Sequence, residues 1–283
     1  MHSSRIVWGC VSAALGFVPF AYAQNAVTKS PTAADWAAMA KLPDFNGVWE
    51  AGGGGGGGGR GAGGGRGAGQ NAKGAPAAGA RGAARGGGRA AQAGPQLTPE
   101  YAALAKTQPP ANADGQTANC LPPGLPTIMN QPYPMEFLLT PGKVTIVIEA
   151  YTQVRHIYTD GRPLPADPDP TFYGTSVGHW EGDTLVAESV GFEKVPRGIN
   201  FPFSDKMKIV ERFHLTDPDT MTIETTVVDP EALTMPYSMG TRTLRRHRNW
   251  TIAEYICEEN NRNYVDANGK AGVNLANPLA APK

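Results

Sequence analysis

Residues 171–190, TFYGTSVGHWEGDTLVAESV, decide the fold class of this chain. Two runs rich in threonine, valine and aromatic residues flank the tetrapeptide Trp180-Glu181-Gly182-Asp183. Such runs on either side of a short glycine-containing turn are typical of a β-hairpin. Similar punctuation recurs from residue 136 to residue 258. The sequence therefore predicts a meander of antiparallel strands.

The spacing of these runs predicts an all-β fold. We expect strands at residues 45–49, 135–139, 144–151, 154–159, 173–180, 184–192, 207–215, 220–228, 241–246 and 250–257. About ten strands joined by short connections favour a closed antiparallel barrel of lipocalin/calycin-like type, with a β-sandwich as the alternative. Thr98 followed by Pro99 resembles a helix cap and first turn, and predicts one short helix near residues 98–106.

The first 23 residues have the organisation of a signal peptide. A basic start at Arg5, an apolar run over residues 6–20 and the small-residue site ending at Ala23 predict cleavage after Ala23. Lipidation at Cys10 is the alternative. No other apolar run approaches the length of a transmembrane segment. We therefore expect a periplasmic or secreted protein with a lead segment at 24–41, a first strand at 42–50, a barrel domain at 97–265 and a flexible tail at 266–283.

Residues 51–96 form a low-complexity insert of glycine, alanine and arginine. It contains no acidic residue and too few apolar side chains to offset the entropy of ordering its backbone, so we expect disorder. One interpretation is a basic arm in weak contact with anionic envelope surfaces, and the other is a tolerated loop expansion. Lysine plus arginine equal aspartate plus glutamate over the whole chain, so the remainder is slightly acidic and nucleic acid is not an expected partner.

After signal cleavage Cys120 and Cys257 are the remaining cysteines. In an oxidising compartment we expect them to form a disulfide, the alternative being two buried unpaired thiols. The chain has no His-Glu-x-x-His, P-loop, dinucleotide fingerprint or nucleophile elbow. No metal and no cofactor are expected.

Two glutamates interrupt apolar strand faces. Alternation over 207–215 places Glu211 on an otherwise apolar face, and alternation over 250–257 does the same for Glu254. A buried carboxylate either stays neutral or takes a cationic partner. These glutamates are therefore candidates for general acid–base chemistry, the alternative being ion pairs with Arg155, Arg212, Arg242 or Arg245.

Residues 155–162, RHIYTDGR, gather polar side chains at a strand end and its turn. His156 and Tyr158 share one face of the strand and are candidates for proton transfer. Arg162 is a candidate for clamping a ligand carboxylate in bidentate fashion. The alternative is that Asp160 and Gly161 build the turn while Arg162 bonds to neighbouring groups at the rim.

Several blocks together resemble a large group of secreted bacterial proteins of unknown function, often with a Gly/Arg-rich insert. They include DFNGVW, CLPPGLP, IYTDGR, WEGDTLV, IVERFHL and EYICEEN. The resemblance implies secretion and one shared architecture. It also implies that the shared polar and aromatic positions are the best site candidates, namely Glu136, Glu149, Tyr158, Asp160, Arg162, Trp180, Asp183, Glu211, Arg212 and Glu254. Where members of the group have histidines, this chain has Leu164 and Phe203.

Gly47-x-Trp49 resembles the start of lipocalin-type barrels, whose tryptophan packs across the barrel floor. We therefore expect a barrel that binds a small, partly apolar molecule. Its expected ligand-binding residues are Arg155, Arg162, Arg212, Trp180, Glu136 and Glu149. One alternative is a lyase, isomerase or hydrolase with Glu211, Glu254, His156 and Tyr158 as catalytic candidates. A second alternative is an envelope-associated structural protein.

Overall fold

The structure is a computed structural model that describes residues 30–51, 94–107, 119–194 and 198–257, together with the backbone of 263–265 and 271–273. The expected signal peptide and nearly all of the insert lie outside these residues. The elements, in chain order, are α1 (Ala33–Met39), β1 (Gly47–Ala51), α2 (Pro99–Ala105), η1 (Thr127–Asn130), β2 (Met135–Thr140), β3 (Lys143–Ile148), η2 (Ala150–Thr152), β4 (Gln153–Tyr158), β5 (Thr175–Glu181), β6 (Thr184–Val190), β7 (Lys208–Asp217), β8 (Thr220–Val228), β9 (Tyr237–His247), β10 (Asn263–Val265) and β11 (Ala271–Val273).

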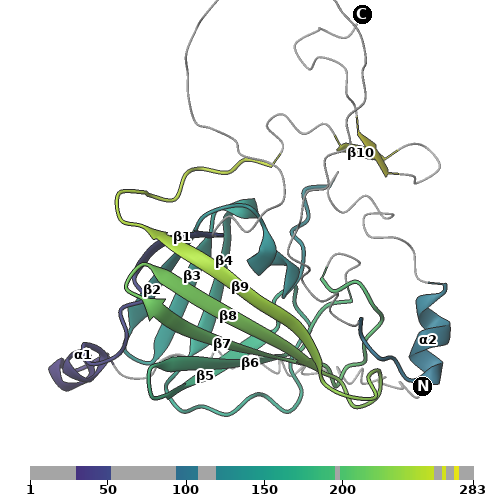
Figure 1. The fold of residues 1–283 in the computed structure, drawn as a ribbon, viewed down its shortest axis with the longest axis horizontal. Helices are drawn as coiled ribbons and strands as arrows, with labels where there is room; N and C mark the ends of the chain where they lie inside the picture. The colour runs from purple at the N-terminus through teal and green to yellow at the C-terminus, as the bar shows by residue number, and fades with distance from the viewer. Residues whose placement is uncertain are drawn as a thin grey trace, which may run out of the picture.

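Strands β1 to β9 form one closed barrel, in which each strand lies beside its neighbour in sequence and β1 also pairs with β9 (Figure 1). This confirms the predicted all-β barrel, because closure by β1 and β9 excludes the alternative of two stacked sheets. The hairpin expected around Gly182 is present as β5 and β6, with Glu181 opposite Thr184 and a positive φ at Gly182. Among the described residues, no helix has the length and apolar character needed to cross a membrane.

One seam of the barrel differs from the expected antiparallel pattern. Strands β4 and β5 pair in parallel, with Ile157 opposite Ser176. Parallel neighbours need a connection of about a dozen residues or more, and residues 159–174 supply it. This connection is fastened to the end of β6, since Thr171 N donates to the Gly191 carbonyl at 3.1 Å. This proline-rich connection returns the chain to the end of the barrel at which β4 begins, instead of making a tight hairpin.

Helix α2 confirms the short helix expected near residues 98–106. Helix α1 was not expected, although Thr32 and Asp35 form a capping box that signals its start. The strand expected over 250–257 is wrong, because these residues have no regular secondary structure and pair with no strand. The β1–β9 pairing already closes the barrel, so no strand edge is left for them. β11 falls within the range expected to be a tail.

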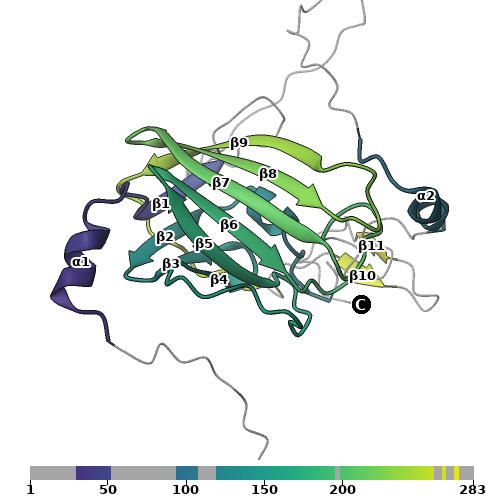
Figure 2. The ribbon, with the colours of Figure 1, turned by 90° about the horizontal axis from the view of Figure 1, so that it is seen from below.

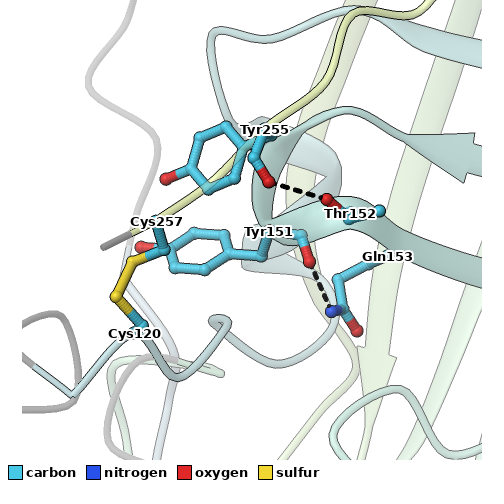
Figure 3. Close-up of a disulfide and its surroundings, with 6 residues drawn as sticks. All are labelled: Cys120, Tyr151, Thr152, Gln153, Tyr255 and Cys257. Carbon is cyan, nitrogen blue, oxygen red and sulfur yellow. Dashed lines mark hydrogen bonds between the residues drawn. A yellow bond between two sulfur atoms is a disulfide. The ribbon is translucent and has the colours of Figure 1, made fainter. Parts of the chain in front are cut away.

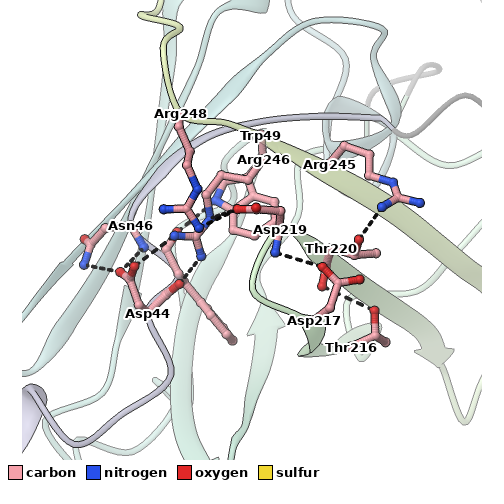
Figure 4. Close-up of polar contacts among 11 residues, drawn as sticks. Asp44, Asn46, Trp49, Thr216, Asp217, Asp219, Thr220, Arg245, Arg246 and Arg248 are labelled. Carbon is pink, nitrogen blue, oxygen red and sulfur yellow. Dashed lines mark hydrogen bonds and ion pairs between the residues drawn. The ribbon is translucent and has the colours of Figure 1, made fainter.

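The core fills the barrel with fully buried apolar side chains, among them Trp49, Phe137 and Phe213. The Trp49 indole donates to the Phe45 carbonyl at 2.9 Å. The Arg246 guanidinium covers the indole ring at 4.5 Å and also bonds to Asp44 at 2.9 Å (Figure 4). Trp49 is therefore anchored in the core by a hydrogen bond and covered by a cation–π contact, while its expected packing across the barrel floor stays a prediction.

A disulfide joins Cys120 to Cys257, with their Cα atoms 5.6 Å apart. This confirms the predicted pairing and excludes two free thiols. Next to it, Thr152 Oγ1 donates to the Tyr255 carbonyl at 2.9 Å, and the rings of Tyr151 and Tyr255 are 5.4 Å apart (Figure 3). The segment after β9 is thus joined to Cys120 by a covalent bond and held against η2 by a hydrogen bond and an aromatic contact.

Candidate functional site

A pocket of about 500 Å³ lies between α1 and one end of the barrel. Figures 1 and 2 place α1 beside this end and α2 at the opposite end. The pocket wall combines apolar side chains with a few polar ones, namely Pro31, Asp35, Ala38, Met39, Leu42, Leu139, Thr140, Pro141, Gly142, Val144, Thr159, Asp160 and Trp180.

The helical wall of the pocket comes from one face of α1 and its flanks. Asp35, Ala38, Met39 and Leu42 follow the three- and four-residue spacing that brings side chains to the same side of a helix. The capping box fixes where this face begins, because Asp35 accepts from Thr32 N at 2.7 Å. No residue of α1 is fully buried. The helix is therefore lightly packed and contributes its apolar face mainly to the pocket.

The barrel wall comes from the β2–β3 turn and the end of β5. Leu139 and Val144 are directly opposite each other in the register of β2 and β3. Gly142 has φ +76°, and a Cβ there would lie 3.1 Å from Asp160 Cβ, so glycine lets the two turns meet. Trp180 packs against Phe45 with ring centroids 5.3 Å apart. The aromatic wall is thus fixed by the core.

The Asp160–Arg162 turn forms the rim. Arg162 Nε and Nη2 donate to the Asp160 carboxylate at distances from 2.6 to 3.0 Å, and the Arg162 guanidinium stacks on the Tyr158 ring at 3.9 Å. These hydrogen bonds from Arg162 hold the pKa of Asp160 below its usual value, although partial burial opposes them. Arg162 therefore binds the carboxylate of Asp160 in the bidentate fashion that was expected for a ligand carboxylate.

A second polar cluster lies inside the barrel. Arg155 of β4 and Glu211 of β7 form an ion pair through Nη2 and Oε2, and both side chains are almost completely buried. Arg155 Nη2 also donates to Ser189 Oγ at 3.2 Å and to Ser176 Oγ at 3.4 Å. The two serine hydroxyls are 2.7 Å apart. Glu211 thus faces inward as expected, and Arg155 is the partner among the four arginines considered.

The ion pair leaves polar atoms unsatisfied. Arg155 Nη1 and Glu211 Oε1 are buried and have no hydrogen-bond partner among the described residues. A single-point ion pair in a sealed interior carries a large desolvation penalty for both charges. The cluster is built as an internal polar contact across the barrel, and its atoms have no exposed surface for a substrate.

The four catalytic candidates do not come together. Glu211 is inside the barrel, whereas His156 is on the outer face of β4, 6.2 Å from Tyr158 between ring centroids. Partial burial and the charge of Lys143 lower the pKa of His156. Glu254 is exposed after β9, so its expected position facing the barrel interior is wrong. None of the four candidates lines the pocket between α1 and the barrel.

The remaining ligand-binding candidates divide between the pocket and the outer surface. Trp180 lines the pocket. Arg212 bonds to Glu181 at 2.8 Å, and Glu149 Oε2 accepts from Ala253 N at 3.0 Å. Glu136 pairs in register with Val147 on β3. The sequence reasoning missed the α1 wall, for which the Thr32–Asp35 capping box and the apolar residues after it were the available signals.

No protein-family model, curated protein or solved structure matches this chain. Within the described residues, no group of three or more His, Cys, Asp or Glu side chains is placed to hold a metal ion. The resemblance to secreted bacterial proteins of unknown function therefore stays a prediction. The pocket geometry carries the functional argument.

Proposed function

We propose that this chain binds a small, partly apolar molecule in the pocket between α1 and the β2–β3 turn. The observation that carries this proposal is a concave site of about 500 Å³ with Met39, Leu42, Leu139 and Val144 in its wall. Binding sites for small molecules are typically concave, mostly apolar and of this size, with a few polar groups that orient the ligand. Trp180 and Asp160 supply an aromatic surface and a polar group here.

The light packing of α1 supports a binding role. The helix has no fully buried residue, yet its apolar face is directed at the pocket. An apolar ligand would fill the space between this face and the barrel, and would remove apolar surface on both sides from water. The proposal therefore includes stabilisation of α1 by the ligand. We also propose that the protein works in the periplasm or outside the cell, where its disulfide persists.

The test uses diphenylhexatriene, a neutral apolar probe whose fluorescence rises when it leaves water. Ala38→Trp places an indole in the pocket, whereas Ala37→Trp adds the same indole on the opposite side of α1. We expect the original chain and Ala37→Trp to bind the probe, and Ala38→Trp to bind it at least about tenfold more weakly. Equal binding by both variants, or no binding by the original chain, would contradict the proposal.

A further inference from the structure

The seam between β4 and β5 leaves part of a strand edge without a partner. In the described part of the chain these strands share two residue pairs, Ile157 with Ser176 and Tyr158 with Val177. β4 ends at Tyr158, whereas β5 continues beyond Val177 to Glu181. The last part of β5 therefore has β6 on one side and no ladder partner among the described residues on the other.

The hairpin turn determines which backbone groups lie on the open side of β5. Glu181 and Thr184 flank a two-residue turn and therefore exchange both of their backbone hydrogen bonds. Backbone groups of successive residues point to opposite sides of a strand, so His179 also bonds to β6, while Gly178 and Trp180 point toward β4. The Gly178 carbonyl and both backbone groups of Trp180 lie past the last β4–β5 pair, and they make no hydrogen bond to any described residue.

The chain after β4 follows the β2–β3 turn instead of β5. Thr159 N donates to the Gly142 carbonyl at 2.8 Å, and a Cβ on Gly142 would lie 3.1 Å from Asp160 Cβ. Thr159 and Asp160 line the pocket from this strand of the seam, and Trp180 lines it from the other strand. The open edge of β5 therefore borders the pocket.

An unpaired strand edge beside an apolar pocket is suited to an extended peptide. In this mode of recognition the main-chain hydrogen bonds give affinity, and the pocket accepts alternate side chains of the peptide. The edge offers the N–H of Trp180 as a donor and the carbonyls of Gly178 and Trp180 as acceptors, which match the groups of a second strand. We infer that the ligand of this pocket is a short apolar peptide that adds to β5 as a strand, with side chains against Met39, Leu42 and Leu139. This inference rests on the proposed function, since it names the ligand class of the same pocket.

Three capped peptides with the same side chains test strand addition by isothermal titration calorimetry. The parent is acetyl-Thr-Leu-Val-Leu-Thr-amide, and its two derivatives are N-methylated either at both leucines or at the valine. In an extended peptide the leucine amides point to one edge and the valine amide to the other. One edge alone faces β5, so one derivative should bind at least about tenfold more weakly than the parent and the other within about threefold of it.

The calorimetric outcomes separate the inference from the proposed function. Equal weakening of both derivatives, or weakening of neither, would overturn the inference, because strand addition uses a single edge of the peptide. Binding of diphenylhexatriene without binding of the parent peptide would overturn the inference and leave the proposed function intact. Failure of both diphenylhexatriene and the peptide to bind would overturn both.

Backbone amide NMR locates the peptide on β5 and needs no variant. The amide of Trp180 lies on the open edge, whereas the amide of His179 bonds to β6 and is the control within the same strand. In the free protein the Trp180 amide should exchange with solvent at least about tenfold faster than the His179 amide. On addition of the parent peptide, the Trp180 amide proton should move downfield, as expected for a new hydrogen bond, and the His179 proton should move less. Equally slow exchange of the two amides in the free protein, or an unmoved Trp180 signal with bound peptide, would overturn the inference.

Discussion

The buried pair of Arg155 and Glu211 allows a sharp test of how the barrel interior is stabilised. Arg155 provides the hydrogen bond that Glu211 makes in the described structure, so Arg155→Met leaves a fully buried carboxylate without a donor. Glu211→Leu leaves the guanidinium with only the hydroxyls of two serines. Removing one partner of a buried pair costs about 3–5 kcal/mol, because the other charge stays buried and uncompensated.

The double variant Arg155→Met/Glu211→Leu should behave differently. It removes both charges together with the two atoms that lack partners, Arg155 Nη1 and Glu211 Oε1. Replacement of a complete buried pair by apolar side chains is often neutral or stabilising. We therefore expect the double variant to be within about 1 kcal/mol of the original chain, which with two single costs of at least about 3 kcal/mol requires a coupling energy of at least about 5 kcal/mol.

The assay is urea unfolding of the four proteins with the disulfide intact, followed by circular dichroism. The free energy of unfolding comes from the midpoint and slope of each transition. Two results would refute the reasoning. If each single variant costs less than about 1 kcal/mol, the charges are solvated. If the two costs simply add in the double variant, the charges are not coupled.

Three further changes probe the fold and its surface. Removing the bridge with Cys120→Ser/Cys257→Ser should lower the free energy of unfolding by about 4–5 kcal/mol, because the bridge spans 137 residues; an unchanged urea midpoint would contradict this. Gly174→Ala should lower the free energy of unfolding by about 2–3 kcal/mol, because the residue has φ +63° and a Cβ would lie 2.4 Å from a backbone oxygen of β6. Gly161→Ala is the control, since this residue has φ +82° but open space around it. It should lower the free energy of unfolding by about 1 kcal/mol in the same denaturation assay. NMR titration should give the ring of His156 a pKa below 6.5, because partial burial and the neighbouring Lys143 disfavour its charged form. The contribution of the neutral ring to stability is therefore lost as the pH falls below 6.5. A pKa above 6.5 would contradict this prediction.

The barrel was predictable because its signal is local. Turn formers such as Gly182 and alternating strand residues specify hairpins within a short window, and consecutive hairpins favour neighbouring strands in the barrel. The parallel pairing of β4 and β5 depends on the path of residues 159–174 in the folded chain, which no local sequence pattern predicts. Alternation correctly placed Glu211 inside the barrel. The same reasoning failed for Glu254, because its segment has strand-like composition but no ladder to join.

The candidate site was only partly predictable. Trp180 was recognised as a ligand-binding candidate and does line the pocket. The other walls are ordinary apolar residues on α1 and the β2–β3 hairpin, which become a site only when tertiary structure places them face to face. Arg162 was recognised by its chemistry, yet its chain neighbour Asp160 occupies its guanidinium. Residue chemistry alone does not reveal whether a polar group is already paired.

The most direct test of the proposed ligand site is NMR of the protein with its methionine methyl groups labelled, before and after addition of diphenylhexatriene. Met39 lines the pocket, whereas Met129 and Met207 are buried elsewhere in the core. The Met39 signal is assigned with Met39→Leu. We predict that the Met39 methyl shows the largest shift, owing to the aromatic probe beside it. An unmoved Met39 signal, with a shift at Met129 or Met207 instead, would place the probe outside the pocket and contradict the account.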